Sequence, residues 1–458
     1  MVPRGGHAHA IKWRAIKWAR DLSRGALLRP AWVGVLLVSW APQFVGLLVR
    51  GVVGSALLSA ERALMETGRY SSSFLSAAGS GFLVASAIAR LPAPMVQLGL
   101  LLSAAQLGLG WALGGSMVAA LGLGSAAGAP VVGQLVDRLG PGRVLAGCLL
   151  AQGAATLGLA LVLSSGPPET WRVLAFVFLI GLSNPQVGAV ARARWSRLLA
   201  GRPAGVTRAM AYEGVVDEVT FVVGPLLAGA LVSIAAPEAV LYWFAAVTVA
   251  AQAGFVLVCW GDPPGHSRGR RRARPPMAGV GRILALLLAG VAVGCGFGAT
   301  QTALSGTIAD AGLVGVVYAA VGAGSAVGGV LAGWLGARVS ARRWLLIGAV
   351  TLLPAAIGLT SAAHPLASGV AAAVLGLGIG MLLVATYALA QVTADAAALT
   401  TVMTGIATSV TIGVSAGAAA TGLILDRAPA LAWTPLLTGC ALALIAALAT
   451  QRQRDAAA

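Results

Sequence analysis

Long apolar stretches separated by short polar connections run along the chain from residue 82 to the C-terminus. Each stretch has about the 20 residues that a helix needs to cross the hydrocarbon core of a bilayer. Glycine, proline or arginine interrupts the pattern at the ends of each stretch. We predict twelve membrane-spanning helices at 82–104, 109–133, 143–165, 171–190, 209–233, 239–260, 281–303, 311–336, 344–362, 366–390, 399–424 and 430–450.

The composition supports an all-α integral membrane protein. The chain of 458 residues is 58% hydrophobic and only 10% charged, whereas soluble domains carry about 25% charged residues. Its four cysteines show neither CxxC nor Cys/His spacing, so we expect neither a disulfide framework nor a metal site. The four histidines fall in the N-terminal tail, the central connection and an outer loop. We therefore predict a protein that is not an enzyme and needs no cofactor.

The arginines indicate how the chain is oriented. With the 133–143 turn in the cytoplasm, eighteen arginines after residue 82 lie on the cytoplasmic side, and only Arg172 and Arg427 lie opposite. This distribution follows the positive-inside rule, so we expect a plasma-membrane protein with both ends of its twelve-helix core in the cytoplasm. Although the net charge is +17, no soluble face exists that could present these charges to a nucleic acid. The expected partners are the bilayer and a small-molecule substrate, and we expect a monomer.

A central connection divides the predicted helices into two sets of six. Residues 261–279 are rich in proline and arginine and predict a cytoplasmic linker between an N-terminal bundle, 71–260, and a C-terminal bundle, 280–458. The turn GQLVDRLGPGR at 133–143 also recurs as GWLGARVSARR at 333–343, with alanine in place of Asp137. Duplicated halves of this kind are typical of secondary transporters.

The first 70 residues form a basic extension that does not fit the twelve-helix pattern. Residues 31–49 are apolar but contain Pro42, and a span here would place the basic tail outside, against the charge rule. Two interpretations stay open. The segment is an interfacial helix, or translation begins at Met65 and residues 1–64 are over-annotated.

The turn between predicted helices 2 and 3 resembles the signature loop of the major facilitator superfamily. The matching positions of this motif loop are Gly133, Asp137, Arg138, Gly140 and Arg143. With twelve helices, the linker and the degenerate second copy, the likeness covers residues 80–450. The segment VTFVVGPLLAG resembles the helix-5 motif of the drug:proton antiporter branch through Gly224, Pro225 and Gly229. Helix 4 departs from the antiporter pattern, because Arg172 stands nine residues before Gly181.

The motif loop suggests a latch between the two bundles. The Asp137 carboxylate is suited to the N-terminus of a neighbouring helix, where the macrodipole favours negative charge. Arginines beside it would pair across the interface and release as the bundles rock. The alternative is that these residues are solvated turn charges that only set the topology.

Four ionisable residues fall inside predicted spans: Arg90 in helix 1, and Glu213, Asp217 and Glu218 in helix 5. Each costs about 2.5–3.5 kcal/mol at mid-membrane, so unpaired charges are expected to be few. A carboxylate whose partner changes between the two conformations can load and release a proton. We expect coupling or a permanent Arg90 pair for Asp217 and Glu218, and a structural role for Glu213.

Polar residues elsewhere are candidates to face a central cavity. The resemblance implies that helices 1, 4, 7 and 10 line the pathway, and the candidates on them are Gln97, Asn184, Gln186, Gln301, Thr302, Tyr387 and Gln391. Single polar residues in a bundle often only bond a neighbouring helix. Pro185 and Pro225 are expected to break their helices and expose carbonyls to the cavity.

The sequence therefore predicts secondary active transport of a small organic solute by alternating access. The partial helix-5 match and the acidic residues favour efflux in exchange for protons. A proton-coupled importer or a uniporter of the same fold is an alternative, and a lipid flippase or membrane-embedded sensor is an alternative of another class.

Overall fold

The computed structural model describes residues 79–166, 168–264, 280–335, 338–362, 364–394 and 399–455. The N-terminal extension before residue 79 and most of the 261–279 linker lie outside these ranges, as do the predictions made for them. Within the described residues, twelve helices are long and apolar enough to cross a membrane. The predicted all-α membrane fold with twelve spans is confirmed.

The N-terminal half contains six spans built from eight helices. The first span consists of α5 (Ser80–Arg90) and α6 (Pro92–Gln106), and the fourth of α9 (Thr170–Leu182) and α10 (Val187–Leu198). The other four are single helices: α7 (Trp111–Leu139), α8 (Pro141–Ser164), α11 (Pro203–Ile234) and α12 (Pro237–Val258).

The C-terminal half contains six spans with one helix each, and the last is preceded by a short 3-10 turn. They are α13 (Val280–Thr307), α14 (Ala311–Trp334), α15 (Ala341–Ser361), α16 (Pro365–Thr393), α17 (Leu399–Arg427) and α18 (Thr434–Asp455), with η3 (Pro429–Leu431) before α18.

Several predicted boundaries differ from the observed ones, and two of the differences change where named residues lie. The motif loop is helical as far as Leu139, and the chain turns at Gly140 alone before α8 begins at Pro141. Gly140 has φ of +86°, a conformation that glycine adopts without steric cost, so a single residue can join the two helices. Span 4 also continues to Leu198 rather than ending at 190, so that Arg192 lies on a helix and not in a loop.

Proline breaks span 1 and span 4 but not span 5. Pro92 starts α6 directly after α5, and Asn184–Pro185–Gln186 separates α9 from α10. A proline lacks the N–H that would continue the helical hydrogen bonds. Pro225, in contrast, lies inside the continuous helix α11, so the predicted break at Pro225 is wrong.

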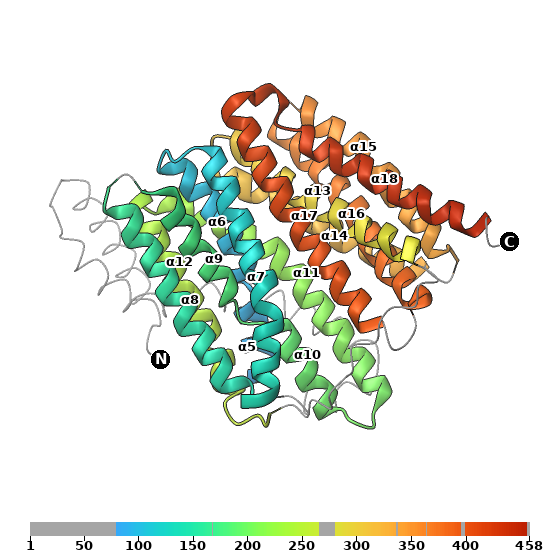
Figure 1. Cartoon of the computed structure of the whole chain (residues 1–458), viewed down its shortest axis with the longest axis horizontal. Helices are drawn as coiled ribbons and strands as arrows, with labels where there is room; N and C mark the ends of the chain where they lie inside the picture. The colour runs from blue at the N-terminus through green and yellow to red at the C-terminus, as the bar shows by residue number, and fades with distance from the viewer. Residues whose placement is uncertain are drawn as a thin grey trace, which may run out of the picture.

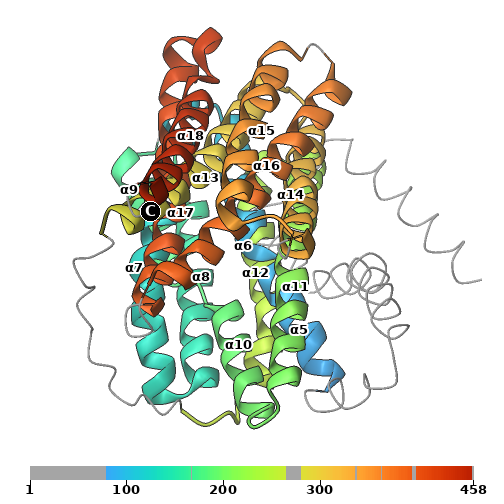
Figure 2. The ribbon, with the colours of Figure 1, turned by 90° about the vertical axis from the view of Figure 1, so that its right-hand side faces the viewer.

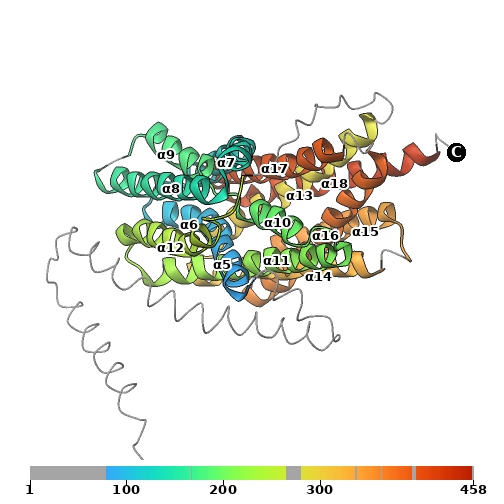
Figure 3. The same ribbon diagram turned by 90° about the horizontal axis from the view of Figure 1, so that it is seen from below.

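The two halves lie side by side (Figure 3), joined mainly through two pairs of long helices. Helix α7 packs along α17, and α11 packs along α14. The arginine-rich ends of the N-terminal half, with α10 and the start of α11, extend away from the C-terminal half (Figures 1 and 2). The two bundles therefore form a V.

Glycines in equivalent positions let helices approach closely within each half. A Cβ atom on Gly124 of α7 would lie 2.2 Å from the carbonyl oxygen of Phe178 in α9. In the C-terminal half, a Cβ on Gly324 of α14 would lie 2.0 Å from the carbonyl oxygen of Ala373 in α16. The two glycines stand at the same offset of 200 residues as the two motif turns, so the duplication extends into helix packing.

The same principle joins the two halves. A Cβ on Gly115 of α7 would lie 2.3 Å from the carbonyl oxygen of Ala418 in α17. Its counterpart Gly315 in α14 would place a Cβ 2.6 Å from the carbonyl oxygen of Pro225 in α11. Small residues permit such close backbone approach in membranes, where packing replaces the hydrophobic effect as the force between helices.

We predict that Gly376→Ala destabilises the protein while Gly369→Ala, on the same helix α16, does not. A Cβ on Gly376 would lie 2.0 Å from the backbone oxygen of Val321, whereas none of the described atoms lies within 4 Å of a Cβ on Gly369. Overpacking of this kind costs about 1–3 kcal/mol. Thermal unfolding of the purified variants in detergent should show a lower midpoint for Gly376→Ala only, and equal midpoints would contradict this packing.

Candidate functional site

A buried ion pair joins span 1 to span 5. Arg90 ends α5 and bonds the carboxylate of Glu213 in α11, with the arginine side chain 6% exposed and the glutamate fully buried. The indole N–H of Trp195 in α10 donates to the other Glu213 oxygen at 2.7 Å. Glu213 thus connects three helices, and the structural role expected for it stays a prediction.

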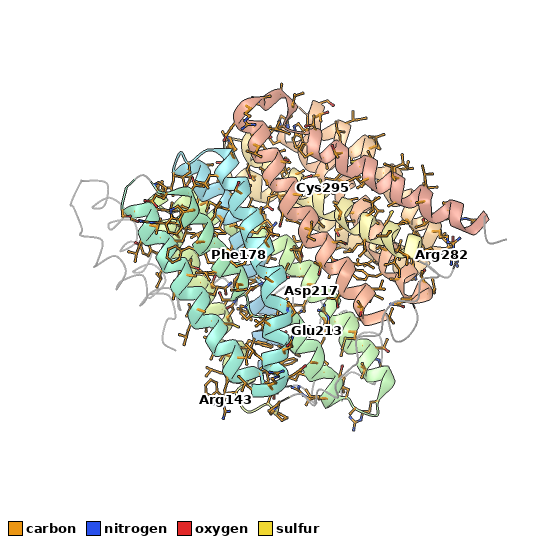
Figure 4. The ribbon with its side chains drawn as sticks, in the orientation of Figure 1. Arg143, Phe178, Glu213, Asp217, Arg282 and Cys295 are labelled. Atoms are coloured by element: carbon orange, nitrogen blue, oxygen red, sulfur yellow. The ribbon has the colours of Figure 1, made fainter. Side chains whose placement is uncertain are left out.

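Asp217, one turn further along α11, lies between two arginines. One carboxylate oxygen is 3.2 Å from Arg90, and the other bonds Arg192 of α10. The Asp217 side chain is 35% exposed and that of Arg192 is 41% exposed. In Figure 4, Glu213 and Asp217 lie on the side of the N-terminal half that faces the other half. The Arg90 pairing predicted for Asp217 is present, and Arg192 is a second partner that the sequence did not reveal.

Glu218 differs from its two acidic neighbours. It is partly buried, and it has no hydrogen bond or ion pair with the part of the chain that the structure describes. One turn away on α11, Phe221 and Val222 pack against Gly322 of α14, so Glu218 lies near the junction of the two halves. Ionised carboxylates without a partner are costly inside a bilayer and mark functional positions in membrane proteins.

The inner part of span 4 carries two further arginines that the sequence placed in a solvated loop. Arg194 and Arg197 both pair with Asp262, at the start of the central linker. The Arg194 guanidinium also lies 5.0 Å from the ring centroid of Phe82, within range of a cation–π interaction. The loop prediction failed because arginines paired with acids on neighbouring elements can extend a helix, and sequence spacing does not show those partners.

The motif loop lies at the arginine-rich end of α7. Gly133, Asp137, Arg138 and Arg143 are exposed, while Gly140 is buried against Asp262 and Pro264. Asp137 forms no ion pair with the described residues. Among the described residues, the latch predicted for Asp137 therefore has no ion-pair partner, and its role stays a prediction.

The helix-5 motif serves close helix contacts. A Cβ on Gly224 would lie 2.6 Å from the ring of Pro94 in α6, and one on Gly229 would lie 2.6 Å from the carbonyl oxygen of Ala311. Because Ala311 begins α14, the motif fastens α11 both to its own half and to the other half.

Of the cavity candidates, only Gln97 and Gln301 bond one another. The Gln97 amide nitrogen donates to the Gln301 side-chain oxygen at 2.8 Å, across the boundary between the halves. Thr302 bonds the backbone of its own helix, and Gln186 bonds the backbone oxygen of Asn184. Tyr387 is partly buried and Gln391 is exposed, both near the arginine-rich end of α16.

The contacts between the halves concentrate at the arginine-poor ends. There α17 bonds the start of α7, and Ser233 of α11 lies beside Gly312 of α14. At the other ends the halves diverge, with Arg143 and Arg282 well apart (Figure 4). Arg192 of α10 and Asp217 of α11 are both partly exposed in the part of the N-terminal half that diverges from the other half.

Residues 70–306, more than half of the chain, match the Major Facilitator Superfamily. The chain belongs to this family and is a multi-pass membrane transporter rather than an enzyme. No curated protein matches the sequence.

Solved transporter structures share the fold. The crystal structure of the nucleoside transporter NupG is 12% identical with a TM-score of 0.63, and 80% of this chain and 98% of that chain are covered. An inward-facing bacterial homologue of the human lysosomal transporter Spinster is 14% identical with a TM-score of 0.62, covering 84% and 99%. A D-xylose–proton symporter is 11% identical with a TM-score of 0.60, covering 82% and 95%.

We predict that Arg90→Met is strongly destabilising and that adding Glu213→Gln restores part of the loss. Removing one partner of a buried ion pair costs about 3–5 kcal/mol, because the other charge stays buried without compensation. The double variant removes that charge. The measurement is the thermal midpoint and the yield of monodisperse protein.

Arg172→Met is the matched control for this prediction. Arg172 pairs with Glu169 in a bridge whose two side chains are each 53% exposed, and such surface pairs contribute about 0–1 kcal/mol. Its midpoint should stay close to that of the unmodified protein. A double variant less stable than Arg90→Met would contradict the burial argument.

Proposed function

We propose that this protein exports a small organic solute by alternating access, in exchange for protons. Membership of the family supports solute transport, and the charged residues of α5, α10 and α11 support the coupling. Four of them neutralise each other in pairs, and Glu218 is left without a partner among the described residues. The proposed coupling depends on this observation, that the Glu218 carboxylate has no partner among the described residues.

The arginine-rich side is proposed to be the cytoplasm, following the positive-inside rule. This assignment places both ends of the twelve-helix core in the cytoplasm of a plasma-membrane protein, which we propose acts as a monomer. The conformation is then inward-facing, with the arginine-poor outer ends closed. The lack of an ion pair between Asp137 and the described residues supports this proposal, because the inner ends that the latch would join lie apart.

Glu218 is the proposed proton carrier. It stands beside α14, whose distance from α11 must change when the two halves rock. A carboxylate at that junction meets different surroundings in the two states and can exchange a proton with each side in turn. Asp217 has a different proposed part. Bound to Arg90 and Arg192 together, it holds span 4 against spans 1 and 5.

Efflux is the proposed direction because the helix-5 positions Gly224, Pro225 and Gly229 resemble the antiporter motif. A proton moving inward gains about 2.3 kcal/mol per 100 mV of membrane potential. That free energy is sufficient to concentrate a neutral solute tens-fold outside the cell.

Glu218→Gln is predicted to abolish proton-driven accumulation of substrate. In inverted vesicles acidified by respiration, the unmodified protein should accumulate members of a panel of cationic and neutral dyes, and an uncoupler should release them. Glu218→Gln retains size and hydrogen bonding but cannot exchange a proton. Its uncoupler-sensitive accumulation should fall to background, while downhill exchange of the same dye persists.

Two variants serve as controls. Glu169→Gln changes an exposed acid at the opposite end and should transport normally. Asp217→Asn should accumulate dye more slowly, but its accumulation should still be sensitive to the uncoupler, because the ion pair between Arg90 and Glu213 remains. Dye flux that the uncoupler leaves unchanged in every variant would indicate a uniporter. Accumulation driven by a proton gradient of the opposite direction would indicate an importer. Full coupling in Glu218→Gln would disprove its role as carrier.

A further inference from the structure

Helix α7 begins at the arginine-poor end without a capping side chain of its own. Its N-cap residue is Gly110, with φ of +83° and no side chain to accept a hydrogen bond. The first N–H groups of any helix have no partner within the helix. At α7, the carboxylate of Asp426 accepts two of them, from Trp111 at 2.9 Å and from Ala112 at 2.8 Å.

Asp426 belongs to the other half of the molecule. It lies in the last turn of α17, more than 300 residues along the chain from the helix that it caps. Both oxygens are used, and a negative charge at this position also meets the positive end of the helix dipole. The contact is therefore a charge-assisted bond between the halves, at the outer ends that are closed in this conformation.

The duplicated helix in the C-terminal half is capped differently. Its N-cap is Asp310, 200 residues after Gly110, and the Asp310 carboxylate accepts from the N–H of Leu313 in its own helix at 2.6 Å. Across the boundary, Ser233 of α11 lies beside Gly312 and Gly229 of α11 lies beside Ala311. Separation of α11 from α14 therefore leaves the cap of α14 intact, whereas separation of α7 from α17 removes the cap of α7.

We propose that Asp426 is the outer lock of the transport cycle. Its carboxylate must leave the N-terminus of α7 before the outer ends can open, and its return stabilises the inward-facing state. The lock sits above the close contact of Gly115 with Ala418 and Gly422. When α7 and α17 move apart, the hydrogen bonds to Asp426 and the close contact at Gly115 break together.

This proposal rests on alternating access but not on proton coupling or on the identity of the substrate. Its test is therefore the accessibility of the outer interface, without any transport measurement. Ser305 of α13 is a suitable reporter position, because it is 4% exposed and lines a cavity of about 480 Å³ at the outer boundary of the halves. A cysteine at this nearly buried position should react faster with a reagent from outside when the lock opens.

The experiment starts from a full-length chain in which Cys148, Cys259, Cys295 and Cys440 are replaced by alanine and Ser305→Cys is introduced. Right-side-out vesicles are treated with a membrane-impermeant maleimide, and the labelling rate is measured. Asp426→Ala should label roughly two- to thirty-fold faster, the range that corresponds to loss of a helix cap. Asp426→Asn retains an acceptor oxygen and should give an intermediate rate.

Asp310→Ala is the matched control, because it removes the same carboxylate from the equivalent helix start: Asp310 lines the same cavity as Ser305 but caps its own helix rather than a helix of the other half. Its labelling rate should equal that of the parent. A second reporter, Tyr387→Cys at the inner side, should label more slowly in inverted vesicles when Asp426→Ala is present, since an opened outer side means a closed inner side. Equal outer labelling in Asp426→Ala and parent would overturn the lock. Faster labelling at both reporters, or an equal increase in Asp310→Ala, would overturn it in favour of general loosening.

Discussion

A charge inside a membrane bundle must be matched by another charge, and this constraint organises the N-terminal half. Arg90 and Glu213 are buried together, and neither is tolerable there alone. Their pairing fixes α5 against α11, and Trp195 adds α10 to the same carboxylate. Asp217 and Arg192 extend the cluster to partly exposed positions. Spans 1, 4 and 5 are thereby joined through one cluster of charged residues.

Close backbone contacts at glycines are the second constraint on the structure, because they join the two bundles. The two bundles meet through α7 with α17 and through α11 with α14, along surfaces that have no room for a Cβ atom at Gly115 or Gly315. Such surfaces either fit or separate, since a small gap loses much of the contact energy. Few polar bonds between the described residues accompany them. Among these bonds are the Asp426 cap and the Gln97–Gln301 bond.

Sequence reasoning located the chemistry but not its geometry. The four ionisable residues in the spans were identified because charge is rare in apolar segments, and three of them prove to be joined. Arg192 fell between two predicted spans and Asp262 in the predicted linker, because arginines in cytoplasmic connections satisfy the charge rule. The sequence did not indicate a role for Asp426, since a single acidic residue at a helix end forms no local pattern. Its partner lies more than 300 residues away.

The sequence by itself determined the twelve spans, the duplication and the family resemblance. These follow from apolar length, from arginine placement and from a repeated turn, all of which are local properties that the bilayer imposes on any chain. Tertiary structure alone decided three outcomes: the partners in each ion pair, the carboxylate that has no partner among the described residues, and the ends at which the two halves are in contact. Glu213 and Glu218 lie on the same helix, yet the neighbours of α11 pair the first and leave the second unpaired among the described residues. Those outcomes depend on distances between helices far apart in sequence, and such distances arise only when the helices pack.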